Sequence, residues 1–332
     1  MLRKVFVSLS VFLVFSFFCV GSQVGAAGEP VHLRFTSMPI GSTWYVQAAT
    51  IASLMRSQLP PKSTIDVLPF GGGIGANTMV GKGDAEMGLC FNVSSKWAYE
   101  GTVAYKGPIK NIRGIVGGLN KQYVGVVVRK GLEADSLRDV KAKKMPVRIY
   151  TMPPYGASFD SARLLLEAYG MSFDMIKSYG GKAEHTTFPS IIAAFKDGRG
   201  DIFIHAITAA HPSITEIAIS SPVKFFSVES KEMEIMTGYG YSPSVFPKGS
   251  FKGQDSDVNL PLLGTNIVVN ADMSDEVAYI IAKTVCENKK GLVKGHSAFE
   301  DFDPENAWKL SVVGLPIHHG AEKYFREKGW MK

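Results

Sequence analysis

Apolar and polar positions along this chain follow two alternating periods, the two-residue period of strands and the three-to-four-residue period of helices. The run VHLRFTS (31–37) has the β-branched and aromatic content of a strand. A helical pattern begins near Ser42 and ends at Pro60. The runs TIDVLPF (64–70) and EMGLCFNV (86–93) predict two further strands. The order predicts a βαβαβ unit.

A second series of the same kind starts at QYVGVVVRK (122–130). Three later runs predict strands between helical patterns: MPVRIYT (145–151), DIFIHAI (201–207) and VKFFSV (223–228). Residues 238–261 are rich in turn-forming residues and predict a connection, after which helical patterns return. The sequence shows no internal repeat. Two α/β lobes are therefore expected, with a cleft between them for a small ligand.

The N-terminus has the pattern of a secretory signal peptide. Arg3 and Lys4 precede an uncharged apolar run (5–20), and small residues follow up to Ala27. Cleavage after Ala26 or Ala27 would remove residues 1–27 and leave about 305 residues, enough for two lobes. A retained anchor is the alternative, although the apolar run is short for a membrane span.

The composition excludes several classes of protein. Loss of the leader would reduce the formal net charge from +6 to +4, and no Lys/Arg cluster of the nucleic-acid-binding type occurs. No later segment is long and apolar enough to span a membrane. Outside the leader, the chain has two cysteines, Cys90 and Cys286, both interpreted as small buried residues. An oxidising compartment would permit a disulfide between them, which the sequence leaves open.

The glycine-rich stretch STIDVLPFGGGIGANTMVGKGDAEMG resembles two nucleotide-binding motifs. Gly71-x-Gly73-x-x-Ala76 matches a dinucleotide fingerprint, but it lies in the second βα unit and leads into a short helix. The run that ends in Gly81-Lys82-Gly83 lacks the Ser or Thr of a P-loop. The stretch therefore does not predict a nucleotide enzyme, and no cofactor is expected.

The physical feature that both motifs exploit is nevertheless present. Glycine lets a backbone approach a ligand, and the start of a helix offers free N–H groups to an anion. Such turns occur at 41–43, at 73–77 and at 155–158, each at the carboxyl end of a predicted strand. One such turn alone is ordinary capping, but three turns split between two lobes predict a shared anion clamp.

Residues with catalytic chemistry form no convincing arrangement. The sequence lacks a G-x-S-x-G motif, HExxH spacing and paired carboxylates, so it predicts neither catalytic residues nor a metal site. His205 ends a strand and is either a core histidine or a ligand contact. Trp44 and Tyr155 flank the turns and are expected to form cleft walls. Hydroxyls and amides at another strand end could bind a carboxylate, notably Asn92 and Ser94.

Several longer runs, taken in order, resemble one known family. They include GSTWYVQAATIASLM, FGGGIGANTMVGKGDAEMGL, PPYGASFDSARLLLEAYGM, AFKDGRGDIF and HHGAEKYFREKG. Together they resemble the TAXI-type solute receptors of TRAP (tripartite ATP-independent periplasmic) transporters, from Leu33 to Gly329. The chain departs from the family pattern at MPIGSTWY, where Trp44 leaves room for a bulkier or more apolar ligand than the usual dicarboxylate.

The resemblance implies an α/β fold of the type II periplasmic binding protein kind, with mixed sheets and a ligand cleft. Residues 28–122 and 263–332 would form one lobe and 123–262 the other, with hinge crossings near 122 and 262. The ligand residues expected from the turns and the family together are Ser42, Thr43, Trp44, Gly72, Gly73, Asn77, Asn92, Ser94, Tyr155, Gly156, Ser158, His205 and Thr208.

The implied function is capture of a small organic acid or amino acid in the periplasm, of the glutamate or 2-oxoglutarate type or bulkier. Closure of the cleft would deliver the ligand to an ion-driven TRAP permease. No catalysis and no nucleic acid are expected. Two alternatives stay open: a secreted enzyme on the same fold that acts on a small acid, and a receptor that passes its signal to a sensor kinase.

Overall fold

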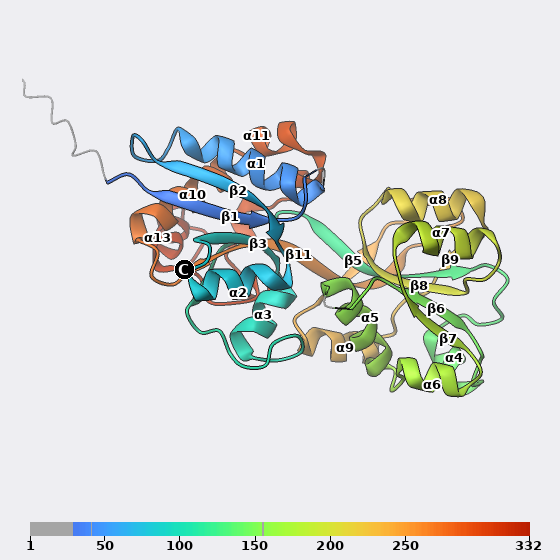
Figure 1. The fold of residues 1–332 in the computed structure, drawn as a ribbon. Coiled ribbons are helices and arrows are strands. Elements are labelled where there is room, and N and C mark those ends of the chain that lie inside the picture. The colour runs from blue at the N-terminus through green and yellow to red at the C-terminus, as the bar shows by residue number, and fades with distance from the viewer. Residues whose placement is uncertain (1–28, 41, 155) are drawn as a thin grey trace, which may run out of the picture.

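Two α/β lobes lie side by side in the computed structural model, which describes residues 29–40, 42–154 and 156–332 (Figure 1). The strands are β1 (His32–Ser37), β2 (Thr64–Gly71), β3 (Met87–Phe91), β4 (Ile112–Val116), β5 (Lys121–Arg129), β6 (Arg148–Thr151), β7 (Lys182–His185), β8 (Ile202–Ile207), β9 (Val223–Phe225), β10 (Ser242–Phe246) and β11 (Val258–Asn270).

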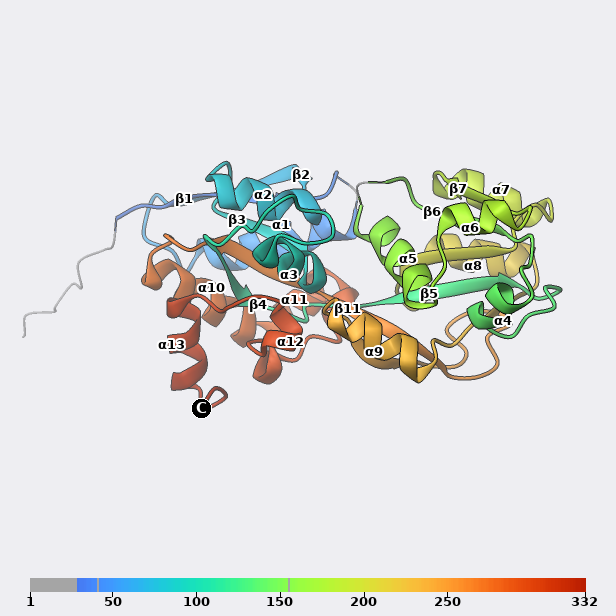
Figure 2. The ribbon, with the colours of Figure 1, turned by 90° about the horizontal axis from the view of Figure 1, so that it is seen from below.

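The helices cover both faces of these strands (Figures 1 and 2). They are α1 (Thr43–Arg56), α2 (Ile74–Lys82), α3 (Asn92–Glu100), α4 (Leu137–Ala142), α5 (Ala157–Ala168), α6 (Phe173–Ser178), α7 (Phe188–Lys196), α8 (Pro212–Ser220), α9 (Ser230–Gly238), α10 (Asp275–Glu287), α11 (Lys289–Gly295), α12 (Leu310–Val313) and α13 (His319–Glu327). Two short 3-10 turns follow α11, at Ser297–Phe299 and Pro304–Asn306.

One mixed sheet runs through both lobes in the order β2-β1-β3-β11-β5-β8-β6-β7. Strands β1, β2 and β3 are parallel, as are β6, β7 and β8, whereas β5 and β11 pair antiparallel with their neighbours. The two connecting strands pair with each other over 121–123 and 262–264. The predicted lobe boundaries near 122 and 262 remain a prediction, and this crossing is the feature that motivates it.

Each lobe has its own hydrophobic core. In the first lobe, α1, α10 and α13 pack on one face of the sheet, and α2 and α3 form a smaller cluster with the segment after α12. The second lobe has one continuous core, which also contains Val93 and Trp97 of α3. Because α3 begins directly after β3 of the first lobe, this helix joins the two cores.

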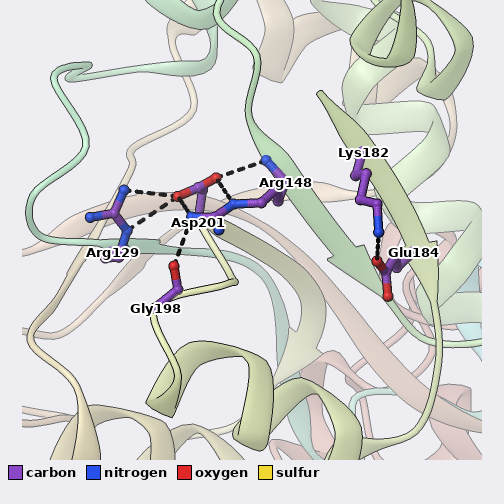
Figure 3. Close-up of polar contacts among 6 residues, drawn as sticks. All are labelled: Arg129, Arg148, Lys182, Glu184, Gly198 and Asp201. Carbon is purple, nitrogen blue, oxygen red and sulfur yellow. Dashed lines mark hydrogen bonds and ion pairs between the residues drawn. The ribbon is translucent and has the colours of Figure 1, made fainter. Parts of the chain in front are cut away.

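A buried carboxylate fixes the strand register of the second lobe (Figure 3). Asp201, directly before β8, accepts hydrogen bonds from the Nε of Arg148 at 2.7 Å and from Arg129 at 2.9 Å. Arg148 also donates to the carbonyl of Gly198, the positive-φ residue that follows α7. Burial alone would raise the pKa of Asp201, but the hydrogen bonds from the arginines outweigh this and hold the pKa below its usual value.

The first lobe contains the same arrangement. Arg34 donates to both carboxylate oxygens of Glu86, directly before β3, and to the carbonyl of Gly83 after α2. Arg34 opens the run RFTSMP and Arg148 opens RIYTMP, and in each case the next helix starts nine residues after the arginine. The structure therefore contains a repeated unit that the sequence analysis did not find, because only a few positions are shared.

Several elements differ from the sequence predictions. Residues 238–261, expected as an irregular connection, include β10 and the first residues of β11. Strands β4 and β7 were not predicted either. Cys90 and Cys286 are buried free thiols, which answers the question that the sequence left open, and burial raises the pKa of both.

We expect Asp201→Asn to lower the free energy of unfolding by about 2–3 kcal/mol, less than a fully buried pair would, because both arginines are about a third exposed. The matched control is Asp197→Asn, whose ion pair with Arg199 is exposed and should contribute less than about 0.5 kcal/mol. Urea unfolding measures both.

Since the folded pKa of Asp201 is lowered, its contribution is complete above the unfolded pKa, about 3.9, and is lost as pH falls through the folded value. The difference between wild type and Asp201→Asn should therefore vanish in acid. A constant difference down to acid pH would contradict this account of the carboxylate.

Candidate functional site

A cavity of about 610 Å³ lies between the two lobes. One wall comes from the start of α2 and the loop after α3, and the other from α5 and the residues before it. The lining residues are Ile74, Thr102, Val103, Ala104, Pro154, Phe159, Asp160, Arg163, Leu164, Glu167 and Tyr239. This interlobe cavity is of the size that small-molecule sites have, and it is the candidate functional site.

The predicted turns lie at the carboxyl ends of strands, as expected. Ser42 is the N-cap of α1, where its Oγ accepts the N–H of Tyr45 at 3.2 Å, and Thr43 begins that helix with an exposed side chain. Gly156 is the N-cap of α5, and Ser158 is the second residue of the helix and half-buried. Tyr155 lies outside the described residues.

Gly72 and Gly73 have a different role from the one predicted. Their N–H groups donate to the carbonyls of Ser37 at 2.7 Å and Leu89 at 3.0 Å, so they tie the turn to β1 and β3. Gly73 also has a φ of 70°, which favours glycine at this N-cap. The N–H groups left for an anion are therefore those that follow, in the first turn of α2, starting at Ile74 in the cavity wall.

Helices α2 and α5 both begin next to the interlobe cavity without a side-chain cap from the described residues. An uncapped first turn keeps N–H groups free and carries the positive end of the helix dipole. One helix belongs to each lobe. The two starts are among the turns that the clamp hypothesis names, and the clamp itself stays a prediction.

Trp44, which was predicted as a cleft wall, belongs to the hydrophobic core of the first lobe and is not among the residues that line the interlobe cavity. Its ring lies 4.6 Å from that of Phe91 and close to Gly73, and only 6% of its surface is exposed. The buried indole Nε1 has no hydrogen-bond partner among the described residues. A buried donor of this kind is usually satisfied, so an acceptor is needed here.

Asn77 and Ser94 are fully buried inside the first lobe. The Asn77 amide donates to the hydroxyl of Tyr105 at 3.0 Å and accepts from Ser95 at 3.2 Å, while Ser94 donates to the carbonyl of Phe91 at 2.9 Å. Both side chains connect α2 and α3 rather than face the cavity. Their predicted ligand role is corrected to one of positioning the two helices.

Asn92 lies at the crossing of the two lobes and is 3% exposed. Its Oδ1 accepts the N–H of Gly264 on β11 at 2.9 Å, and its Nδ2 donates to the carbonyls of Ser311 and Gly240 at 3.3 and 3.4 Å. It also lines a second, smaller cavity of about 220 Å³ on the β5–β11 crossing. The hydrogen-bonding groups of Asn92 are thus used in contacts around the β5–β11 crossing, and its ligand role stays a prediction.

His205 belongs to an aromatic cluster on the second lobe. Its ring stacks on Phe203 at 5.4 Å and meets Phe188 and His211 edge-on at 5.1 and 5.3 Å. Burial lowers the pKa of His205 to about 3, so the ring is neutral at physiological pH. Thr208, three residues on, is half-buried and accepts the N–H of His211.

The sequence analysis missed the charged residues of the interlobe cavity. Asp160, Arg163 and Glu167 follow one another at three- and four-residue spacing along α5. The prediction of this helix from the sequence used only its apolar face. The three charged residues, at three- and four-residue spacing, lie on a second face, which lines the cavity. The opposite wall contains Val103, whose φ of 55° is strained for a β-branched residue.

Two further observations limit the chemistry. Within the part of the chain that the structure describes, no group of three or more His, Cys, Asp or Glu side chains is placed to hold a metal ion. In the same residues, no helix has the length and apolar character that a membrane span requires.

Comparisons with known proteins agree with this architecture. The family model described as the NMT1-like family matches residues 35–329. The structure is similar to MatC from Rhodopseudomonas palustris with bound malate, at 13% identity and a TM-score of 0.51, covering 91% of this chain and 98% of that one. It is also similar to the alkanesulfonate-binding protein SsuA from Xanthomonas axonopodis pv. citri bound to MOPS, at 11% identity and a TM-score of 0.46, covering 91% and 92%.

A TRAP periplasmic solute-binding protein from Rhodobacter sphaeroides matches at 12% identity and a TM-score of 0.41, over 90% of this chain and 99% of that one. At such identities the likeness concerns the fold, whereas the family match extends over most of the chain. The chain belongs to the NMT1-like family and has the α/β fold of periplasmic solute-binding proteins.

Proposed function

We propose that this chain is an extracytoplasmic solute receptor that captures a small organic acid or amino acid between its two lobes. The observation that carries the proposal is the interlobe cavity, whose walls come from both lobes and which adjoins the uncapped starts of α2 and α5. A ligand that contacts both walls stabilises the closed form by its differential contacts. Binding alone, without turnover, then performs the function.

The partner and the location are part of the same proposal. A periplasmic receptor would need the leader at residues 1–27, which lies outside the described residues, to be cleaved. We further propose that the chain is of the TAXI type and that its partner is a TRAP-type ion-driven permease, which would recognise the closed form. The family runs quoted above support this finer assignment, and the NMT1-like match supports the receptor class.

Of the two alternatives, an enzyme on the same fold would convert a bound acid, and a sensor receptor would bind it without transport. The arrangement around the interlobe cavity favours binding. Among the described residues that line it, the three charged ones, Asp160, Arg163 and Glu167, form ion pairs with one another, which leaves no free carboxylate there for proton transfer.

The direct test is a thermal-shift screen of the chain from residue 28 onward against organic acids, amino acids and nucleotides. A true ligand should stabilise the native state by about 2.7 kcal/mol at a hundredfold excess over its Kd. We expect shifts with one class of acid, none with nucleotides, and no conversion of the bound acid. A shift with nucleotides alone, or turnover of the acid, would overturn the proposal.

A second prediction concerns the helix starts. If a carboxylate lies over the starts of α1 and α5, as the sequence analysis expects, Ser42→Ala and Ser158→Ala should each weaken binding of the acid found in the screen about three- to tenfold, through loss of one hydroxyl contact. Titration calorimetry measures the affinity.

Ser172→Ala is the matched control, because Ser172 caps α6 with the same hydroxyl-to-N–H bond that Ser42 makes in α1. Ser172→Ala should lower the free energy of unfolding about as much as Ser42→Ala does and leave the affinity for the acid unchanged. Unchanged affinity for the acid in both Ser42→Ala and Ser158→Ala would show that the carboxylate binds elsewhere.

A further inference from the structure

The charged residues of the interlobe cavity form one ion-paired set on α5. Arg163 donates from one guanidinium nitrogen to Asp160 at 3.2 Å and from another to Glu167 at 2.8 Å. The side chain of Asp160 is 11% exposed, that of Arg163 30% and that of Glu167 42%. The set therefore runs from the buried base of the cavity to its mouth.

This set dominates the charge of the cavity. Among the described residues that line it, Asp160, Arg163 and Glu167 are the ones charged at neutral pH, so the lining carries two negative charges and one positive. Burial raises the pKa of Asp160, and the Arg163 guanidinium opposes this by pairing with the carboxylate. A ligand that places a second carboxylate here meets a like charge in a partly desolvated cavity.

Among the described residues that line the cavity, the wall opposite α5 offers no compensating cation. It consists of Ile74 and the Thr102–Ala104 loop, and Tyr239, which follows α9, also lines the cavity. The positive feature of the cavity that stays available is the first turn of α2, because the first turn of α5 already contains Asp160. One end of the cavity region therefore attracts an anion, and the α5 set attracts a hydrogen-bond donor or a cation.

We propose that Asp160, Arg163 and Glu167 read the charge of the far end of the ligand and favour a carboxylic acid that also carries an ammonium or similar cationic group over a dicarboxylic acid. The inference rests on the proposed function and narrows its substrate class. Asp160 and Glu167 accept hydrogen bonds from the cationic group, and Arg163 holds both carboxylates in place. The three are specificity-determining residues.

The test compares matched pairs of acids by thermal shift and calorimetry on the purified wild-type protein: 4-aminobutanoate with glutarate, glutamine with glutamate, and asparagine with aspartate. In each pair the first member has no net charge and the second is more negative. We expect the first member of a bound pair to bind at least about tenfold more tightly, because the more negative member places an additional like charge beside Asp160 and Glu167.

Asp160→Asn and Glu167→Gln should each reduce this preference several-fold by improving the affinity of the more negative member. Glu167 is the more exposed of the two, so its variant tests the inference even if Asp160→Asn folds poorly. The control is Asp174→Asn on α6, which removes the carboxylate of an equivalent i,i+3 ion pair with Lys177 on an exposed surface and should leave the preference unchanged.

Equal or tighter binding of the dianions by wild type would overturn the inference and leave the proposed function intact. The same holds if simple monocarboxylates bind and no member of any pair does, because an ammonium group is then not selected. If Asp160→Asn and Glu167→Gln both keep the wild-type preference for the members without net charge, other residues determine that preference and the inference is wrong. If no acid of any class binds, the proposed function itself fails.

Discussion

One interaction joins the same elements in both lobes: an arginine on a parallel strand binds the acidic residue that precedes a neighbouring strand. In the first lobe it joins Arg34 to Glu86, and in the second Arg148 to Asp201. In each lobe the same guanidinium also binds the carbonyl at the end of the preceding helix. Helix end and strand start are therefore fixed together, which sets where the carboxyl ends of the strands lie.

These contacts at the amino ends of the strands also affect the turns at the carboxyl ends. Because the register is fixed at the amino ends, the turns after β1 and β6 leave the sheet at equivalent places. There Ser37 and Thr151 make the same hydrogen bond, each to the carbonyl of the methionine that follows. The helices that begin nine residues after each arginine then present their first turns at the same edge of each lobe. A ligand site shared by two lobes follows from one repeated βαβ arrangement.

Under the proposed function, the link between the lobes has to allow movement without losing this register. Strands β5 and β11 cross between them, and α3 contributes Trp97 to the core of the second lobe and donates its indole N–H to the carbonyl of Tyr239. Asn92, at the start of α3, bonds to three separate segments around the crossing. Under the proposed function, closure would bend the molecule at these contacts, since hinges lie in a few residues at the ends of elements.

Much of the fold could be predicted from the sequence, because apolar periodicity decides the local elements. The parallel strands of both lobes except β7, and the starts of α1 and α5, were found in this way. The long strand β11 was not, since Pro261 and Gly264 interrupt its apolar run. Its strand character comes from pairing with β10, the strand before it, and with β3, β4 and β5, which are distant in sequence.

The site was predictable only as a set of turns. Sequence alone could place Ser42 and Gly156 at helix starts, because capping is local. It could not show that Ser37 and Leu89 already occupy the N–H groups of Gly72 and Gly73, since these contacts join separate strands. The cavity face of α5 could not be predicted either, because it is defined by contacts with residues 74 and 102–104, which are distant in sequence.

The central claim is that the two lobes close around a small acid, and small-angle X-ray scattering tests it most directly. The protein would be measured alone and with a saturating amount of the acid that gives the largest thermal shift. The account predicts a smaller radius of gyration with the acid, because closure brings the lobes together. An unchanged radius at full occupancy would contradict it.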